Sequence, residues 1–254
     1  QTIDVLKTRS NPLGINLVVG KLEDLNLTED IYGILVQYPD QNGEIVDYTS
    51  LFKEADEKGV FKAVAADFLS LALIKSPGEL GADIAVGSTQ RFGVPMGYGG
   101  PHAAYFATKE EFKRQMPGRI IGISVDAQNK RALRMVLQTR EQHIKREHAT
   151  SNICTAQVLL AIMAGMYAVY HGPEGIKAIA ERVHSLTGLA AAGIKEAGFT
   201  IANKSYFDTL KIAVASADEK EKIKKIAVAK EINLRYFEDN FVGLSVAEPF
   251  TPSD

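Results

Sequence analysis

The sequence predicts an α/β protein with a mainly parallel, doubly wound sheet in its first part and an incomplete α+β unit at its end. Apolar runs typical of buried strands alternate there with amphipathic helical segments. The 254 residues are 46% hydrophobic and 24% charged, which suits one large domain or one and a half. One strand, expected at 83–86, leads into a loop rich in glycine and proline. Because ligands in open α/β sheets bind beyond the carboxyl ends of strands, we expect a site at this loop; a tight surface turn is the open alternative.

The opening elements follow from apolar runs bounded by turn residues. A helix is expected to end near Leu6, because Asn11-Pro12-Leu13-Gly14 follows it. An amphipathic helix lies between two of the expected strands and ends at Gly59; its apolar face is formed by Tyr48, Leu51, Phe52 and Ala55. Strands are expected at 15–19, 31–36, 60–66, 83–86 and 103–107, with an acidic connector at 21–30.

The second part of the chain contains two long helical patterns. The first, at 155–170, is apolar nearly all round, so we expect it to be deeply buried. The polar segment 139–152 before it must face solvent, a ligand or a partner. The other expected helices are at 110–115, 174–197 and 218–230, and the other strands at 120–125, 133–137, 199–202, 209–215, 232–237 and 243–246. We divide the chain into a large-domain portion, a connecting helix and a truncated small domain, at 1–172, 173–198 and 199–254.

Charge and composition argue against several classes of partner. The formal charge of −2 gives no long-range attraction for nucleic acid or an anionic membrane. No apolar run approaches the roughly 20 residues of a membrane span, and no signal segment opens the chain. The single cysteine, Cys154, fits a reducing compartment and is interpreted as a small buried apolar residue rather than a nucleophile. The chain opens inside an expected helix and stops just after an expected strand, so we interpret it as an excised fragment.

Most short motifs for cofactors and metals are missing. The run Gly97-Tyr98-Gly99-Gly100 is followed by Pro101 and does not match the dinucleotide-binding or nucleotide-phosphate patterns. His143 and His148 would lie about 140° apart on a helix, and we expect no metal site. Asp67 comes directly after the strand at 60–66. Its carboxylate could hold the ring nitrogen of a cofactor, or it could cap the next turn.

Longer motifs resemble a known family. They are Gly87-Ser88-Thr89-Gln90-Arg91-Phe92-Gly93-Val94-Pro95-Met96-Gly97-Tyr98-Gly99-Gly100-Pro101-His102-Ala103-Ala104, Met116-Pro117-Gly118-Arg119, Leu137-Gln138-Thr139-Arg140-Glu141-Gln142-His143-Ile144, Ala149-Thr150-Ser151-Asn152-Ile153-Cys154-Thr155, Phe207-Asp208-Thr209-Leu210-Lys211 and Arg235-Tyr236-Phe237-Glu238-Asp239. Together they are similar to the P-protein of the glycine cleavage system, glycine dehydrogenase (decarboxylating), over nearly the whole chain.

The resemblance implies a fold-type-I architecture of pyridoxal-phosphate enzymes, and specifically the amino-terminal, α-subunit-like half of the family. The family's carboxyl-terminal half carries the lysine that binds the cofactor as an imine, and the corresponding position here falls at Gln90 or Arg91. No lysine lies between Lys75 and Lys109. An amide cannot form the imine, and a guanidinium stays protonated and is a poor nucleophile. We therefore expect Asp67, Gln90 and Arg91 to be degenerate counterparts of cofactor-binding positions, with no covalently bound cofactor in this chain.

In the complete enzyme, the resemblance implies decarboxylation of glycine through a pyridoxal-phosphate imine and transfer of the aminomethyl group to the lipoyl arm of the H-protein. This chain would complete the active site and interface of the lysine-bearing half or β subunit, in the cytoplasm or, in a eukaryote, the mitochondrial matrix. Alone it would be inactive. Candidates to line the cleft or interface are Arg91, Tyr98, His102, Arg140 and His143. Each also has a local alternative, such as a surface ion pair for Arg140, a packed ring for Tyr98 or a loop hydrogen bond for His102.

Two other functions remain open from the sequence. The chain could be a structural dimerisation module with no ligand site, or an independent pyridoxal-phosphate enzyme with an unusual anchor. A visible imine band that borohydride reduces would separate the last from the other two.

Overall fold

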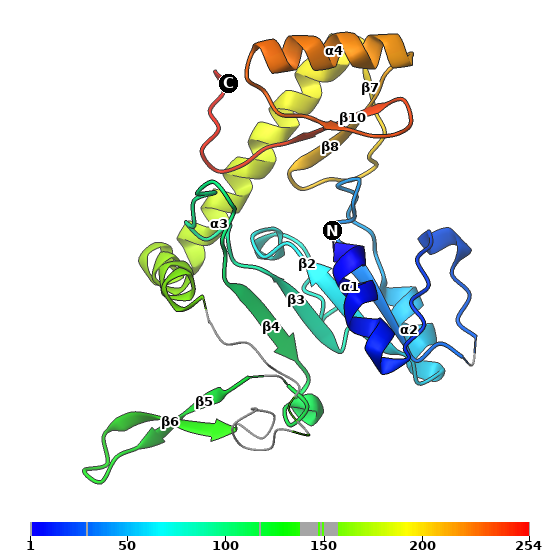
Figure 1. The fold of residues 1–254 in the computed structure, drawn as a ribbon. Helices are drawn as coiled ribbons and strands as arrows, with labels where there is room; N and C mark the ends of the chain where they lie inside the picture. Colours follow the sequence, from blue (N-terminus) through cyan, green and yellow to red (C-terminus); the bar gives the residue numbers. More distant parts are fainter. Residues whose placement is uncertain are drawn as a thin grey trace.

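The computed structural model describes residues 2–28, 30–116, 118–137, 147, 149 and 157–253, arranged as two sheets and a separate β-ribbon (Figure 1). The α-helices are α1 (Thr2–Ser10), α2 (Thr49–Glu57), α3 (Val158–Glu196) and α4 (Ala217–Ala229). The strands are β1 (Gly33–Tyr38), β2 (Phe61–Ala66), β3 (Ile84–Ser88), β4 (Ala104–Thr108), β5 (Ile120–Val125), β6 (Arg131–Leu137), β7 (Thr200–Ile201), β8 (Thr209–Ala213), β9 (Arg235–Tyr236) and β10 (Phe241–Ser245). Short 3₁₀ turns are η1 (Asn11–Leu13), η2 (Leu22–Asp24), η3 (Ser70–Ala72) and η4 (Glu110–Phe112).

The first sheet has the strand order β1-β2-β3-β4. β2 pairs in parallel with β1 and β3, and β4 joins β3 antiparallel, so the predicted mainly parallel sheet is confirmed. Helix α2 crosses from β1 to β2 and packs Phe52 against Val64 and Ala66 of the sheet. The predicted apolar face of this helix and its end before Gly59 are confirmed. Because β1, β2 and β3 run the same way, their carboxyl ends lie along one edge.

The second sheet, in the order β7-β8-β10-β9, is antiparallel and packs beside α3. Its core is continuous with that of the first part. The side chain of Phe207, just before β8, is 1% exposed and packs with Leu69 near η3 and with Ala180 and Val183 of α3. This packing places the start of β8 close to the carboxyl edge of the first sheet.

Helix α3 joins the two predicted long helices into one element with a break. Gly172 has φ 63° and ψ 179° inside it, and Pro173 follows. A left-handed φ is readily adopted only by glycine, so the break falls where glycine and proline stand in the sequence. It coincides with the boundary expected between 1–172 and 173–198; the division into domains stays a prediction.

Three expected elements were wrong. At 110–115 the structure has only the 3₁₀ turn η4 instead of a helix. Residues 15–19 form no strand, because no strand among the described residues pairs with them, and Val18 and Val19 are exposed. The helical segment expected to be deeply buried instead exposes most of its apolar side chains: Val158, Leu159, Ile162, Met163, Met166, Val169 and Tyr170. Tyr170 is 84% exposed. The hydropathy of this segment indicates an apolar surface that needs to be buried, but the described residues do not cover it.

Strands β5 and β6 form a two-stranded ribbon that extends away from the first sheet (Figure 1). Side chains that alternate along β5 and their partners on β6 share one apolar face. It is formed by Ile121, Ile123, Val125, Leu133 and Met135, all exposed. Within the described part of the chain, no helix is both long and apolar enough to span a membrane.

Candidate functional site

The chemistry-bearing residues predicted from the sequence meet at the carboxyl edge of the first sheet. Asp67 follows β2, and Thr89, Gln90 and Arg91 follow β3. Gly87 in β3 allows these segments to approach closely, because a Cβ there would lie 2.3 Å from the carbonyl oxygen of Ala66. Neighbouring parallel strands thus bring the predicted residues together.

Arg91 is the centre of this cluster. Its Nη1 forms an ion pair and hydrogen bond with Oδ2 of Asp208, and lies 3.5 Å from Oδ2 of Asp67. The guanidinium carbon is also 5.7 Å from the centre of the Phe207 ring. One cation therefore joins carboxylates from β2 and from the start of β8, which are far apart in the sequence.

Local hydrogen bonds fix the two carboxylates. Oδ1 of Asp67 accepts a hydrogen bond from the backbone N–H of Ser70 at 2.8 Å, so the capping role considered from the sequence is confirmed. Oδ1 of Asp208 accepts one from the hydroxyl of Thr209 at 2.8 Å. Both residues thus present Oδ2 to Arg91 while the other oxygen is held in place.

Burial sets the electrostatics of the cluster. Burial raises the pKa of Asp67, and the nearby Arg91 charge only partly offsets the effect. Burial opposes the charge on Arg91 as well, but Asp67 and Asp208 outweigh it and raise the pKa of the guanidinium. Arg91 therefore stays charged and neutralises one of the two facing carboxylates.

Aromatic rings fill the space beside Asp67. Phe68 stacks on Phe92 and on Tyr105, with ring centres 4.7 and 4.5 Å apart, so both faces of its ring are covered. The hydroxyl of Tyr105 donates to the carbonyl of Ala66 at 3.0 Å, and burial raises its pKa to about 12. The ring of Phe92 also lies 5.4 Å from that of Tyr167 in α3.

These residues do not fit covalently held pyridoxal phosphate. The edge presents an amide and a guanidinium after β3, at the position that the family resemblance assigns to the cofactor lysine, and neither group can form an imine. Lys109, the next lysine along the chain, follows β4 and reaches Oδ1 of Asp83 at 2.5 Å, beside the amino end of β3 and so at the opposite edge of the sheet. Asp67 is already engaged by Arg91.

The other predicted residues lie apart from this cluster or outside the described chain. Tyr98 has φ 57° and a fully exposed side chain, so its predicted alternative as a packed ring was wrong. His102 is exposed and its Nδ1 lies 2.8 Å from the carbonyl oxygen of Ala103, so the predicted loop hydrogen bond is confirmed. Arg140 and His143 lie outside the described residues, as does Cys154.

Sequence reasoning missed several residues of the cluster. Asp208 and Phe207 were noted only as part of a family motif, without a role. That motif, far from Arg91 in the sequence, was the one signal that could have pointed to them. The stacking of Phe68 and Tyr105 had no signal in spacing, because the contact depends on the pairing of β3 with β4.

Three buried polar atoms in this region have no hydrogen-bond partner among the described residues. They are Oγ1 of Thr89, Nε2 of Gln90 and Nη2 of Arg91. Because buried polar groups are normally hydrogen-bonded, these consecutive residues can still bind water or a further polar group.

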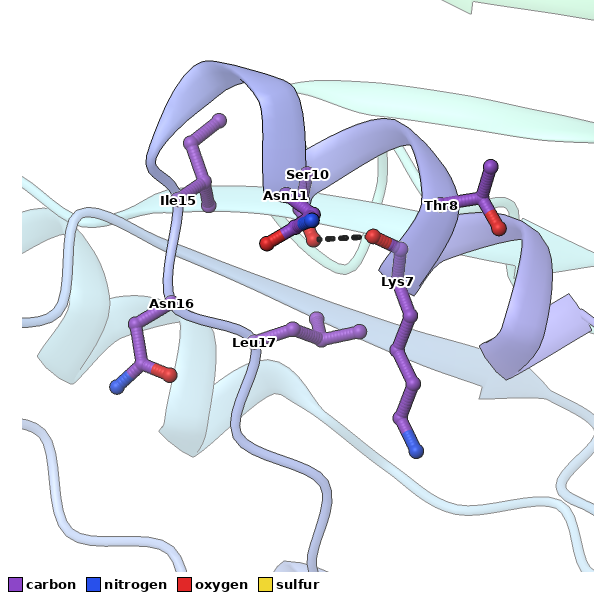
Figure 2. A pocket seen from close by; sticks show the side chains of 7 residues that line it. All are labelled: Lys7, Thr8, Ser10, Asn11, Ile15, Asn16 and Leu17. Carbon is purple, nitrogen blue, oxygen red and sulfur yellow. Dashed lines mark hydrogen bonds between the residues drawn. The ribbon is translucent and has the colours of Figure 1, made fainter.

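A hollow elsewhere on the surface does not contain the predicted residues. It has a volume of about 550 Å³ and lies between α1 and the segment that returns after η1 (Figure 2). Its lining is formed by Lys7, Thr8, Ser10, Asn11, Ile15, Asn16 and Leu17. With one charged side chain it offers little chemistry, so the carboxyl edge remains the candidate site.

Comparisons with known proteins agree on one family. The family model for the glycine cleavage system P-protein matches residues 1–254. A glycine dehydrogenase (decarboxylating) from Nostoc punctiforme is 58% identical over all of this chain and 26% of the relative. The protein of the same name from Flavobacterium johnsoniae is 55% identical over the same shares. The chain thus spans about a quarter of the length of these relatives.

Solved structures support the fold. A crystal structure of glycine decarboxylase (P-protein) of the glycine cleavage system, in inhibitor-bound form, matches with a TM-score of 0.80 and 32% identity, over 89% of this chain and 53% of that one. A cysteine desulfurase from Thermococcus onnurineus matches with a TM-score of 0.59 and 19% identity, over 96% of this chain and 65% of that one, which shows the fold alone. The architecture is the fold type I of pyridoxal-phosphate enzymes, as the sequence predicts.

Proposed function

Because the chain belongs to the glycine cleavage system P-protein family, we propose that it is a non-catalytic part of a glycine-decarboxylating enzyme. The complete enzyme decarboxylates glycine with pyridoxal phosphate and passes the aminomethyl group to the lipoyl arm of an H-protein. The lysine that holds the cofactor lies on another part of the enzyme, the carboxyl-terminal half or a β subunit. The 58% identity to a glycine dehydrogenase (decarboxylating) over the whole chain supports this assignment.

One observation carries the non-catalytic role. At the carboxyl edge of the sheet, where a cofactor amine is required, Gln90 and Arg91 follow β3, and Arg91 is bound to Asp67 and Asp208. Lys109 is held by Asp83 at the other edge. Neither residue after β3 can bond an aldehyde, so the chemistry must be supplied by the partner part.

The exposed loop after Val94 is the proposed contribution to the shared cleft. Tyr98 and His102 stand in this loop with exposed side chains and are free to contact a partner. Arg140 and His143 are proposed for the same cleft from the family motif. The single cysteine supports a reducing compartment such as the cytoplasm.

Reconstitution tests this proposal. The chain alone, with pyridoxal phosphate, should release no labelled carbon dioxide from carboxyl-labelled glycine, and borohydride should reduce no cofactor onto it. Adding the lysine-bearing part and H-protein should restore release. Decarboxylation by the chain alone, or a borohydride-reducible band that survives dialysis, would refute the proposal.

A second function, a structural dimerisation module without a site, is favoured by the exposed apolar face of α3, which includes Leu159 and Val169. Variants in the loop separate the two. Tyr98→Ala and His102→Ala should lower kcat of the reconstituted enzyme if the loop completes the site, whereas the control Met96→Ala, exposed in the same loop, should not. Equal activities with intact assembly would support the structural module.

A further inference from the structure

We propose that Arg91 keeps pyridoxal-type cofactors out of this chain by occupying Asp67, the carboxylate with which a protonated ring nitrogen would pair. The inference deepens the proposed non-catalytic function and rests on it. It assigns the loss of the cofactor site to a second feature besides the missing lysine. The guanidinium of Arg91 lies beside Asp67, where the cation of the cofactor ring would otherwise bind.

The geometry supports a built-in cation. Arg91 follows β3 and reaches Asp67 after the neighbouring strand, with 3.5 Å between Nη1 and Oδ2. Asp67 lies at the carboxyl end of a parallel strand, where ligands bind in open α/β sheets, and an aspartate is a known partner for the ring nitrogen of pyridoxal phosphate. A guanidinium is a planar cation, as a pyridinium ring is, and competes for the same carboxylate.

The second carboxylate keeps Arg91 in this position. Asp208 pairs with the same Nη1, and its other oxygen is fixed by Thr209. The guanidinium of Arg91 is the positive charge that faces both carboxylates. Removing the guanidinium leaves two facing carboxylates without a counter-charge, an arrangement that favours the uptake of an external cation.

A purely structural ion pair would make a different prediction. If Arg91 only fastened β8 to the sheet, its removal would lower stability but would create no affinity for a ring cation. The two roles are therefore separated by binding, measured on folded protein.

Equilibrium dialysis with pyridoxamine 5′-phosphate tests the proposal, because this probe has no aldehyde and cannot bond to surface lysines. The full chain is compared with Arg91→Ala, with Arg91→Gln, which retains more volume if the alanine variant does not fold, and with Asp67→Asn/Arg91→Gln. Arg131→Ala removes an exposed arginine of the ribbon and is the matched control.

We expect the Arg91 variants to bind the probe at least about tenfold more tightly than the unmodified chain, and the double variant to lose this gain. The control should behave as the unmodified chain does. A folded Arg91→Gln chain that binds no more tightly, or a double variant that keeps the gain, would overturn the inference. If reconstitution with the lysine-bearing part still restores decarboxylation in that case, the proposed function stands and only the role of Arg91 is lost.

Discussion

The contact between the turn after β1 and the start of β8 can be tested by replacing one glycine of the turn with alanine. Gly43 lies in this turn with φ 84°, and a Cβ there would stand 2.4 Å from the backbone oxygen of Thr209 and 2.7 Å from its Cβ. Two hydrogen bonds lie nearby: Asn203 Nδ2 donates to the carbonyl of Asn42 at 2.8 Å, and the backbone N–H of Ser205 donates to Glu44 at 2.9 Å. Gly43→Ala therefore forces the two parts of the molecule apart.

The expected loss of unfolding free energy in Gly43→Ala is the sum of two contributions that can be measured separately. Placing alanine in the left-handed region costs about 1–2 kcal/mol of unfolding free energy. Gly59 has φ 67°, and a Cβ added there would meet nothing within 4 Å, so this position isolates the first contribution. Gly59→Ala should therefore cost about 1–2 kcal/mol. The overlap with Thr209 adds a further contribution of about 1–3 kcal/mol at Gly43, because backbone atoms must shift.

Urea unfolding followed by circular dichroism measures both variants against the unmodified chain. Gly43→Ala should be the less stable of the two. Equal losses, within about 0.5 kcal/mol, would show that the turn does not touch Thr209 and would refute the packing of the two parts described above.

Three further predictions concern the core, the acidic cluster and a helix start. Phe207→Ala should lower the unfolding free energy by about 3–5 kcal/mol, and the exposed Phe250→Ala by less than about 1 kcal/mol, both measured by urea unfolding. Burial raises the pKa of Asp67 above 3.8, so the folded state holds the proton of this carboxyl more tightly than the unfolded state. The free energy of unfolding should therefore fall as the pH rises from 3.8 through the pKa in the folded state. Asp67→Asn should lack this decline when unfolding is measured across pH. Ser216→Ala removes the acceptor for the backbone N–H of Glu219 and should lower the free energy of unfolding by about 1 kcal/mol, as measured by thermal unfolding.

The parts of the fold that the sequence predicted are those in which pattern and burial agree. The strand at 60–66 is apolar except for Lys62, is bounded by Gly59 and Asp67, and is central in its sheet, so its prediction was correct. The run at 15–19 is also mostly apolar, but a strand requires a partner, and no strand in the described part of the chain pairs with it. Apolar runs alone cannot distinguish these cases.

The candidate site was predictable in its location and not in its contacts. Asp67 was singled out because it follows a strand, and Arg91 because the family resemblance places it or Gln90 at the position of the cofactor lysine. Both strands end at the same edge of the sheet. The partner of Arg91, Asp208, is 117 residues further along the chain, and no local spacing indicates their contact. The burial of the helix expected at 155–170 was misjudged for the same reason. An apolar helix sequence does not show which other segment, if any, packs against it.

The ribbon of β5 and β6 has a consequence for handling the protein. Its exposed strands have unpaired edges in the described structure, and such edges template pairing between molecules. The exposed cations Arg131 and Arg134 repel a second copy at low ionic strength. Added sulfate screens that repulsion and also strengthens apolar association, so dilute buffers should keep preparations monodisperse and salting-out conditions should precipitate them early.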